Sequence, residues 1–262
     1  MSSPNPIATP SSAPTTAQTT AILSAMAQEQ SGLLEQLANA SKVRHAGRDF
    51  WLGRLHGQSV VLVLSNIGKV AATTTATAMI ERFGVQRMVF TGVAAGLKSG
   101  VNVGDVVVGQ SFVQHDLDVS PLFPRYEVPL YGKSVFDADA VLTAALLAAS
   151  RGALADASLH QAYLGAKVHL GLIASGDRFI SKATESNAVR ADLQAAGHDA
   201  LALEMECAAV AQVCHDYSVP FAAVRTISDR ADDGAHVDFL SFMDQVASKY
   251  AVAIIERFLK SL

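Results

Sequence analysis

The sequence has few cysteines, and neither they nor the histidines form a metal-ligand pattern. The two cysteines, Cys207 and Cys214, are too few for a disulfide framework and indicate a reducing compartment. They lie seven residues apart in a stretch of helical pattern, so we expect both to face one packed side. The eight histidines form no H-E-x-x-H motif, and no C-x-x-C pair is present. The sequence therefore predicts neither a catalytic metal nor another cofactor.

An excess of basic residues is also lacking. Lys and Arg number 20 against 24 Asp and Glu, which gives a net charge of −4. This balance argues against binding to nucleic acid or to an anionic membrane. No apolar run reaches transmembrane length, and the first charged residue is Glu29, so neither a secretory signal nor an arginine-bearing transit peptide is indicated. We therefore expect a soluble, cytoplasmic protein with no nucleic-acid or membrane partner.

The first 20 residues differ in composition from the rest of the chain. Residues 1–20 contain four of the eight prolines and no charged side chain. Such a segment cannot bury enough apolar surface to offset the entropy lost on ordering, so it is predicted to be a disordered tail. No internal repeat or linker follows it. Residues 21–262 are therefore expected to form a single domain.

After this tail, short strand patterns that are apolar on both faces alternate with helical patterns, and half of all residues are hydrophobic. Asp137 is a plausible N-cap for one of the helices. Apolar strands that alternate with helices predict an α/β domain with a mixed, largely parallel central sheet flanked by helices. We expect strands at 21–25, 59–65, 87–91, 105–109, 168–175 and 221–227, and helices at 29–39, 68–83, 138–150, 204–217 and 240–262.

In sheets of this kind ligands bind beyond the carboxyl ends of the strands. Three segments follow predicted strands, at 25–29, 92–96 and 228–229. The glycine and alanine residues of 92–96 would let a ligand approach the backbone closely. This run fits neither the dinucleotide pattern nor the phosphate-binding P-loop, and no G-x-S-x-G element is present. A close-packing loop explains it equally well.

Carboxylates accompany two of these segments, and each has two interpretations. Glu29 opens a predicted helix, as do Glu204 and Glu206, where a negative charge is favoured by the helix dipole. Asp229 follows a buried strand and could be a turn or cap residue. If Glu29, Glu206 and Asp229 meet at one edge of the sheet, they are suited to acid–base or hydrolytic chemistry rather than to hydride transfer.

Six blocks of this sequence resemble a known family. They are LEMECAAVAQVCHDYSVPFAAVRTISDRADD (203–233), AILSAMAQEQSGLL (21–34), SNIGKVAA (65–72), VFTGVAAGL (89–97), VGDVVVG (103–109) and SGDRFI (175–180). The blocks are similar to the purine and uridine phosphorylase superfamily, and the resemblance that they mark extends over essentially everything after Thr20. The closer similarity is to the 5′-methylthioadenosine/S-adenosylhomocysteine nucleosidases. The resemblance implies a nucleoside phosphorylase-like fold, a homodimer, and hydrolysis of the N-glycosidic bond of 5′-methylthioadenosine, S-adenosylhomocysteine or 5′-deoxyadenosine.

The same resemblance implies roles for single residues. Asp229, after Ser228, would be the general acid that protonates N7 of adenine, and Glu29 would position and activate the attacking water. Glu206 would accept hydrogen bonds from the ribose hydroxyls, and Arg225 would brace the acidic cluster. The other implied substrate-binding residues are Met205 beneath the sugar and Glu204 beside it, Phe179 and Ile180 at the purine, Met26, Ile67 and Phe239 at the 5′-alkylthio group, and Ala94 and Ala95 at the floor.

Elementary chemistry supports this set of groups. Cleavage of an N-glycosidic bond passes through an oxocarbenium-like state and needs a protonated leaving group, a nearby carboxylate and an activated water. Asp229 must then hold a proton, which burial near Glu206 and Glu29 would favour.

The sequence departs from the family at several positions. Ala27 and Gln28 stand where relatives often have further acids, and Ala95 stands where many have glycine. The segment 115–129 is unlike that of better-known bacterial enzymes, and in the family this region reaches the 5′ subsite of a neighbouring subunit. The preferred 5′ substituent is therefore left open.

Three other functions stay open at this point. A phosphorylase needs cations for phosphate, commonly an arginine shortly before the segment that starts at Gly92, whereas this chain has Phe90 there. Hydrolases of futalosine or AMP share the fold, and AMP would again require cations. A non-catalytic nucleoside-binding or storage protein should have lost Glu29 or Asp229, and both are present.

Overall fold

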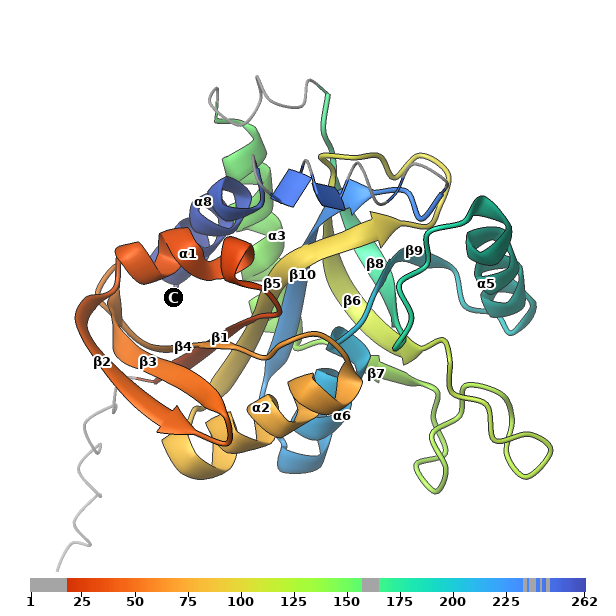
Figure 1. The fold of residues 1–262 in the computed structure, drawn as a ribbon, viewed down its shortest axis with the longest axis horizontal. Coiled ribbons are helices and arrows are strands. Elements are labelled where there is room, and N and C mark those ends of the chain that lie inside the picture. Colours follow the sequence, from red (N-terminus) through yellow and green to blue (C-terminus); the bar gives the residue numbers. More distant parts are fainter. Residues whose placement is uncertain (1–17, 157–164, 233–234, 236–238, 241, 244–245) are drawn as a thin grey trace, which may run out of the picture.

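The structure is a computed structural model that describes residues 18–156, 165–232, 235, 239–240, 242–243 and 246–262 (Figure 1). Its strands are β1 (Thr20–Ser24), β2 (Ala38–His45), β3 (Arg48–Leu55), β4 (Gln58–Leu64), β5 (Arg87–Gly96), β6 (Val106–Gln114), β7 (Val135–Asp137), β8 (Val168–Ser175), β9 (Ala200–Glu204) and β10 (Phe221–Asp229). Its helices are α1 (Ala27–Glu35), α2 (Lys69–Phe83), α3 (Ala140–Leu154), α5 (Ala183–Ala195), α6 (Cys207–Tyr217) and α8 (Ala247–Lys260).

All the strands belong to one mixed sheet with the order β10-β6-β8-β9-β5-β1-β4-β3-β2, and β7 pairs with β6. β1 pairs in parallel with β4 and β5, and β8 pairs in parallel with β6 and β9. β10 lies parallel to β5 and antiparallel to β6, while β5 and β9 are antiparallel. The pairing of β5, β9, β8, β6 and β10 therefore closes into a ring, which brings the ends of strands distant in sequence to one place. The predicted single α/β domain with a mixed sheet is confirmed.

Helices cover both faces of the sheet (Figure 1). α1, α3 and α8 share one core, to which α8 contributes Tyr250 and Ile254. α2 and α6 share the other core, in which both Cys207 and Cys214 are buried, as expected from their spacing. The last helix, α8, begins at Ala247, whereas a helix was predicted to begin at 240. Residues 241 and 244–245 of the predicted helix lie outside those described. Within the described ranges, no helix combines the length and apolar character needed to cross a bilayer.

Several predicted boundaries were wrong. Thr20, assigned to the tail, is buried in β1 and pairs with β4 and β5, so the ordered chain begins before Ala21; residues 1–17 lie outside the described part. Asp137 ends β7, and the N-cap of α3 is Asp139, whose Oδ1 accepts a hydrogen bond from the Leu142 N–H at 2.8 Å. Helix α1 ends at Glu35, and the hairpin β2–β3 follows where a longer helix was expected.

Candidate functional site

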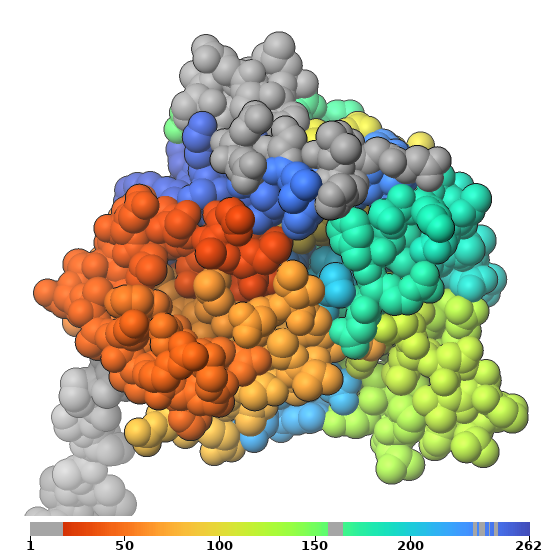
Figure 2. Space-filling model, in the orientation of Figure 1, coloured from red at the N-terminus to blue at the C-terminus, as the bar shows by residue number. Residues whose placement is uncertain are grey.

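One cavity lies at the carboxyl ends of β1, β5, β9 and β10, with an empty volume of about 650 Å³. In Figure 2 the orange surface around α2 and the teal surface around α5 face each other across a hollow in the middle of this side. Every site residue named from the sequence lines this cavity: Met26, Glu29, Ile67, Ala94, Ala95, Phe179, Ile180, Glu204, Met205, Glu206, Arg225, Ser228, Asp229 and Phe239. Their placement together is observed, while their individual roles stay predictions.

Glu29 lies in the first turn of α1, and backbone N–H groups outside this helix hold its carboxylate. Its Oε2 accepts hydrogen bonds from the N–H groups of Ala25 and Met26, both at 2.8 Å, and its Oε1 accepts one from Val93 at 2.9 Å. Burial raises the pKa of the Glu29 carboxyl, against the opposing effects of Arg225 and these three N–H groups. The arrangement fixes both oxygens inside the cavity and makes the group a stronger base than an exposed glutamate.

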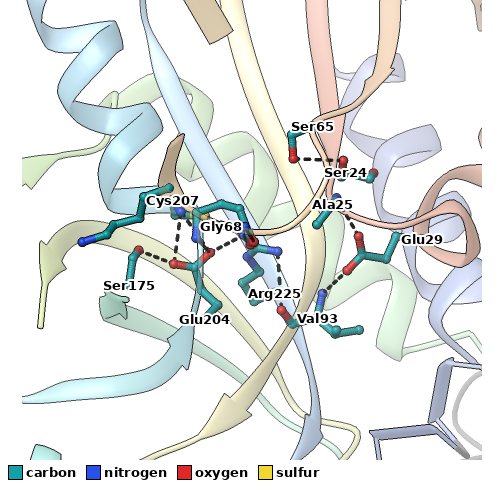
Figure 3. A network of polar contacts seen from close by, with 12 residues as sticks. Ser24, Ala25, Glu29, Ser65, Gly68, Val93, Ser175, Glu204, Cys207 and Arg225 are labelled. Carbon is teal, nitrogen blue, oxygen red and sulfur yellow. Dashed lines mark hydrogen bonds and ion pairs between the residues drawn. The ribbon is translucent and has the colours of Figure 1, made fainter. Parts of the chain in front are cut away.

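Gly92 provides the space that Glu29 needs. A Cβ at this position would lie 2.7 Å from Glu29 Oε1 and closer still to Arg225 Nη1. Any side chain would therefore displace Glu29 or Arg225. The segment 92–96 was predicted to follow a strand, but it forms the end of β5. Val93 in this segment links the two groups, because its N–H donates to Glu29 and its C=O accepts from Arg225 at 3.4 Å (Figure 3).

Arg225 lies between two carboxylates in the interior of β10. Its Nη2 donates to Glu204 Oε2 and, at 3.2 Å, to Glu206 Oε2, and its guanidinium stacks 4.3 Å above the centre of the Phe90 ring. Burial favours the neutral form of Arg225, but the surrounding Cys207, Glu204 and Glu206 raise its pKa above the ordinary value. Arg225 is therefore a charged group whose Nη atoms hold both glutamates in place, while its buried Nε has no hydrogen-bond partner among the described residues.

Glu204 is a structural anchor for the turn into α6. Glu204 was predicted to open a helix, but it ends β9. Its carboxylate accepts from the Ser175 hydroxyl, from the N–H of Glu206 at 3.0 Å and from the N–H of Cys207 at 2.9 Å (Figure 3). With Arg225 added, the hydrogen-bonding capacity of this carboxylate is largely used by the protein.

Glu206 occupies the N-cap position of α6 and is less completely paired than Glu204. Its Oε1 accepts from the Gly68 N–H at 2.9 Å, and its Oε2 accepts from Arg225. Burial raises the pKa of Glu206 to about 7, with Arg225 lowering it and Glu204 raising it. Glu206 is therefore a carboxylate, able only to accept hydrogen bonds, mainly above neutral pH.

Asp229 faces the cavity from the last position of β10, not from the segment after the strand. Its Oδ2 accepts from the Ser228 hydroxyl at 2.9 Å and its Oδ1 accepts from the Ala231 N–H at 2.9 Å. Ser228 Oγ also lies 3.4 Å from the carbonyl oxygen of Ala94. These contacts orient the Asp229 carboxyl from one side.

The rest of the lining is mostly apolar. The rings of Phe179 and Phe239 meet edge to face with 5.7 Å between their centres. Phe179 is 47% exposed and Ile67 is 53% exposed, so both lie at the rim where the cavity opens. A planar, apolar ligand with polar atoms near Glu206 and Asp229 suits this lining.

The sequence reasoning missed several lining residues, namely Ala25, Val93, His115, Arg178 and Leu203. His115 is the most informative, because burial lowers its pKa and favours a neutral ring. It follows β6, which runs five residues beyond the strand predicted at 105–109, so a search of the predicted strand ends would not have reached it. Arg178 was within a quoted block and forms an ion pair with Glu185 at 3.0 Å.

Known proteins are similar to this chain in both fold and sequence. Residues 19–260 match the model of the phosphorylase superfamily. A 5′-methylthioadenosine/S-adenosylhomocysteine nucleosidase of Bacillus thuringiensis (strain Al Hakam) is 37% identical over 240 residues, which are 90% of this chain and 97% of the relative.

Solved structures agree with this match. The 5′-methylthioadenosine/S-adenosylhomocysteine nucleosidase of Neisseria meningitidis, in complex with methylthio-immucillin-A, has a TM-score of 0.83 at 34% identity, covering 94% of this chain and 100% of that one. Futalosine hydrolase of Helicobacter pylori strain 26695 has a TM-score of 0.81 at 30% identity, covering 94% and 99%. Because both its sequence and its fold agree with these relatives, this chain belongs to the phosphorylase superfamily and, within it, to the 5′-methylthioadenosine/S-adenosylhomocysteine nucleosidases.

Proposed function

We propose that this chain hydrolyses the N-glycosidic bond of 5′-substituted adenine nucleosides and releases adenine. The observation that carries the proposal is the shared cavity of Glu29 and Asp229, with Glu206 between an arginine and a backbone N–H. These are a base for water, an acid for the leaving base and an acceptor for sugar hydroxyls. The family to which the chain belongs supports the same reaction.

In the proposed reaction, Glu29 takes a proton from a water molecule as that water attacks C1′ of the sugar. The raised pKa of Glu29 lies closer to the pH at which the enzyme works, which favours general base catalysis. The three N–H donors keep the carboxylate from turning away from the water. The C1′–N9 bond breaks with its electron pair going to adenine.

Asp229 is proposed to donate a proton to N7 of the departing adenine. Phe179 would stack on the base and Ile180 would bind its edge through the backbone. Glu206 would accept hydrogen bonds from the ribose hydroxyls, and its negative charge would stabilise the positive sugar of the transition state. Met26, Ile67 and Phe239 would contact an apolar 5′ substituent, and the open rim at Ile67 leaves space for a longer one.

The charge of the cavity favours water over phosphate. Four carboxylates line it, those of Glu29, Glu204, Glu206 and Asp229. Of the arginine and lysine residues that the structure describes, the cavity lining includes Arg225, which is paired with two glutamates, and Arg178, which is paired with Glu185. A phosphate anion would have to compete with these carboxylates for both arginines, so phosphorolysis is disfavoured.

Adenine release with and without phosphate tests the proposal. We expect the full chain to release adenine from 5′-methylthioadenosine, S-adenosylhomocysteine or 5′-deoxyadenosine at a rate unchanged by added phosphate or by a chelator. The described residues gather no group of His, Cys, Asp and Glu that could hold a metal ion. Futalosine belongs in the same assay because a futalosine hydrolase shares the fold.

Three results would contradict the proposal. A rate that rises with phosphate while a sugar 1-phosphate accumulates would indicate a phosphorylase. Binding of these nucleosides without release of adenine would indicate a non-catalytic nucleoside-binding protein. Cleavage of futalosine alone would keep the reaction class but change the substrate.

We also propose that the protein is a cytoplasmic homodimer. Large apolar side chains are exposed on α2 and in the segment between β6 and β7: Val70, Leu122 and Leu130, the last of which is 92% exposed. A second copy that covered them would remove an unfavourable contact with water. Sedimentation velocity of the full chain is expected to give a dimer, and a monomer at micromolar concentration would contradict this proposal.

A further inference from the structure

The rim of the cavity contains a charged cluster that the proposed reaction does not use. Lys69 begins α2, and its Nζ lies 2.5 Å from Asp116 Oδ1 and 3.1 Å from Gln114 Oε1. The other oxygen of Asp116 accepts a hydrogen bond from the Asp177 N–H at 2.8 Å. The Lys69 side chain is 16% exposed, which is little for a lysine on a surface helix.

Asp177 caps helix α2 from a distant part of the chain. Its Oδ1 accepts from the Lys69 N–H at 2.8 Å, across 108 positions of sequence. The N-cap residue itself is Gly68, which has no side chain to provide a cap. Gly68 has a φ of 98°, and a Cβ there would lie 3.2 Å from Asp177 Oδ1, so the aspartate packs directly on the glycine.

The cluster joins two walls of the cavity. Ile67 and Gly68 belong to the connection from β4 to α2, and Phe179 belongs to the connection from β8 to α5, two residues after Asp177. The Gly68 N–H is the donor that binds Glu206 Oε1 at 2.9 Å. Whatever fixes Gly68 therefore also fixes a hydrogen bond to the carboxylate that faces the sugar site.

We propose that Lys69, Asp116 and Asp177 form a clasp, a polar cluster that holds these two walls together. The clasp maintains the hydrogen bond from the Gly68 N–H to Glu206. Its three members are positioning residues, because none of them lines the cavity. The kinetic consequence rests on the function proposed above, in which Glu206 binds the ribose.

The clasp differs from an ordinary surface ion pair, which contributes little to the stability of a fold. Lys69 is largely buried and has two acceptors, and Asp116 has both of its oxygens occupied. Burial opposes ionisation of Asp116, but the Lys69 ammonium and the Asp177 N–H outweigh it and lower the pKa of this carboxyl. The Asp116 carboxylate is therefore ionised and paired throughout the neutral range.

Loss of the clasp has a distinctive effect on Glu206. The groups that act on this carboxyl are Arg225 from β10, Glu204 from β9, Glu29 from α1 and the Gly68 N–H. The Gly68 N–H stabilises the carboxylate and lowers its pKa, so release of Gly68 moves the pKa of Glu206 upward. The acidic limb of the kcat/KM profile then shifts to higher pH, because a larger part of Glu206 is protonated at a given pH.

Two substitutions at the half-exposed Asp177 separate positioning from folding. Asp177→Ala removes the cap, and we expect KM for 5′-methylthioadenosine to rise roughly tenfold, with kcat close to that of the parent and the acidic limb moved to higher pH. Asp177→Asn keeps an oxygen for the Lys69 N–H and is expected to restore most of the affinity. The matched control is Lys98→Met, which breaks the exposed ion pair of Lys98 and Asp199 and leaves KM unchanged.

Hydrogen exchange provides a readout that does not depend on turnover. The amides of Gly68 and Lys69 are expected to exchange faster in Asp177→Ala than in the parent, and Asp177→Asn is expected to reverse this. A parent chain that releases no adenine contradicts the proposed function, and the exchange comparison still tests the clasp. Unchanged exchange at these amides, or an Asp177→Ala variant with parental KM and pH profile, contradicts the clasp.

Discussion

Asp229→Asn is expected to lower kcat for adenine release by roughly 10²-fold or more, the scale of general acid catalysis. The amide keeps the shape of the side chain: its oxygen can still accept from the Ala231 N–H and its NH2 group can donate to Ser228 Oγ, but it has no acidic proton to give to N7. KM is expected to change less than kcat, because proton donation takes place in the transition state. Steady-state kinetics beside a thermal midpoint on the same samples measures both effects.

The control for this variant is Asp199→Asn. Asp199 is an exposed aspartate that pairs with Lys98 away from the cavity lining, so its amide should leave kcat unchanged. If Asp229 were only a turn residue, Asp229→Asn would lower the thermal midpoint and keep the turnover of each folded molecule. Near-parental kcat in a folded Asp229→Asn chain would rule out its assignment as the acid.

Glu29→Gln is the second substitution with a large expected effect. Glutamine cannot accept the proton of water, so we expect kcat to fall by a similar factor of roughly 10² or more. Glutamine also has an NH2 group in place of one carboxylate oxygen. This NH2 group cannot accept hydrogen bonds from the N–H groups that Ala25, Met26 and Val93 direct at this side chain. The attacking water therefore loses both its base and its position.

Stability distinguishes this role from that of a helix-terminal charge. The pKa of Glu29 in the folded chain is raised above its value in the unfolded chain, so its charge lowers the stability of the fold as pH rises above that unfolded value. A neutral glutamine relieves this cost at pH 8, which offsets the hydrogen bonds that it loses, so we expect little net loss in thermal midpoint. A favourable interaction with the helix dipole predicts the opposite, a lower midpoint with turnover kept. Glu35→Gln, at the exposed end of the same helix, is the matched control.

The sequence was sufficient to predict which residues meet at the site. Glu29, Glu206 and Asp229 each follow or end a strand, and the carboxyl ends of parallel strands converge at one edge of a sheet. Strand pattern alone therefore led to Glu29 and Asp229. The resemblance to the family led to Glu206, because β9, the strand before it, was not predicted. The strand containing Asp229 was predicted two residues too short, and Glu204 was assigned to a helix although it ends β9.

Features that depend on contacts distant in sequence could not be predicted in this way. The space that Gly92 leaves for Glu29 and Arg225 is set by three separate elements. The cap of α2 comes from Asp177 in another loop, so the first turn of this helix shows no capping signal of its own. The strand β2 is mostly exposed and polar, and its sequence lacks the alternation that marks a half-buried strand.

The central claim, that water attacks the sugar, is tested most directly by the oxygen atom that the product gains. The chain is incubated with 5′-methylthioadenosine in ¹⁸O-labelled water containing phosphate, and the sugar product is analysed by mass spectrometry. The account predicts free adenine together with a free 5-methylthioribose that carries one ¹⁸O atom from the solvent. A sugar 1-phosphate without solvent oxygen at C1′ would contradict it and assign the attack to phosphate.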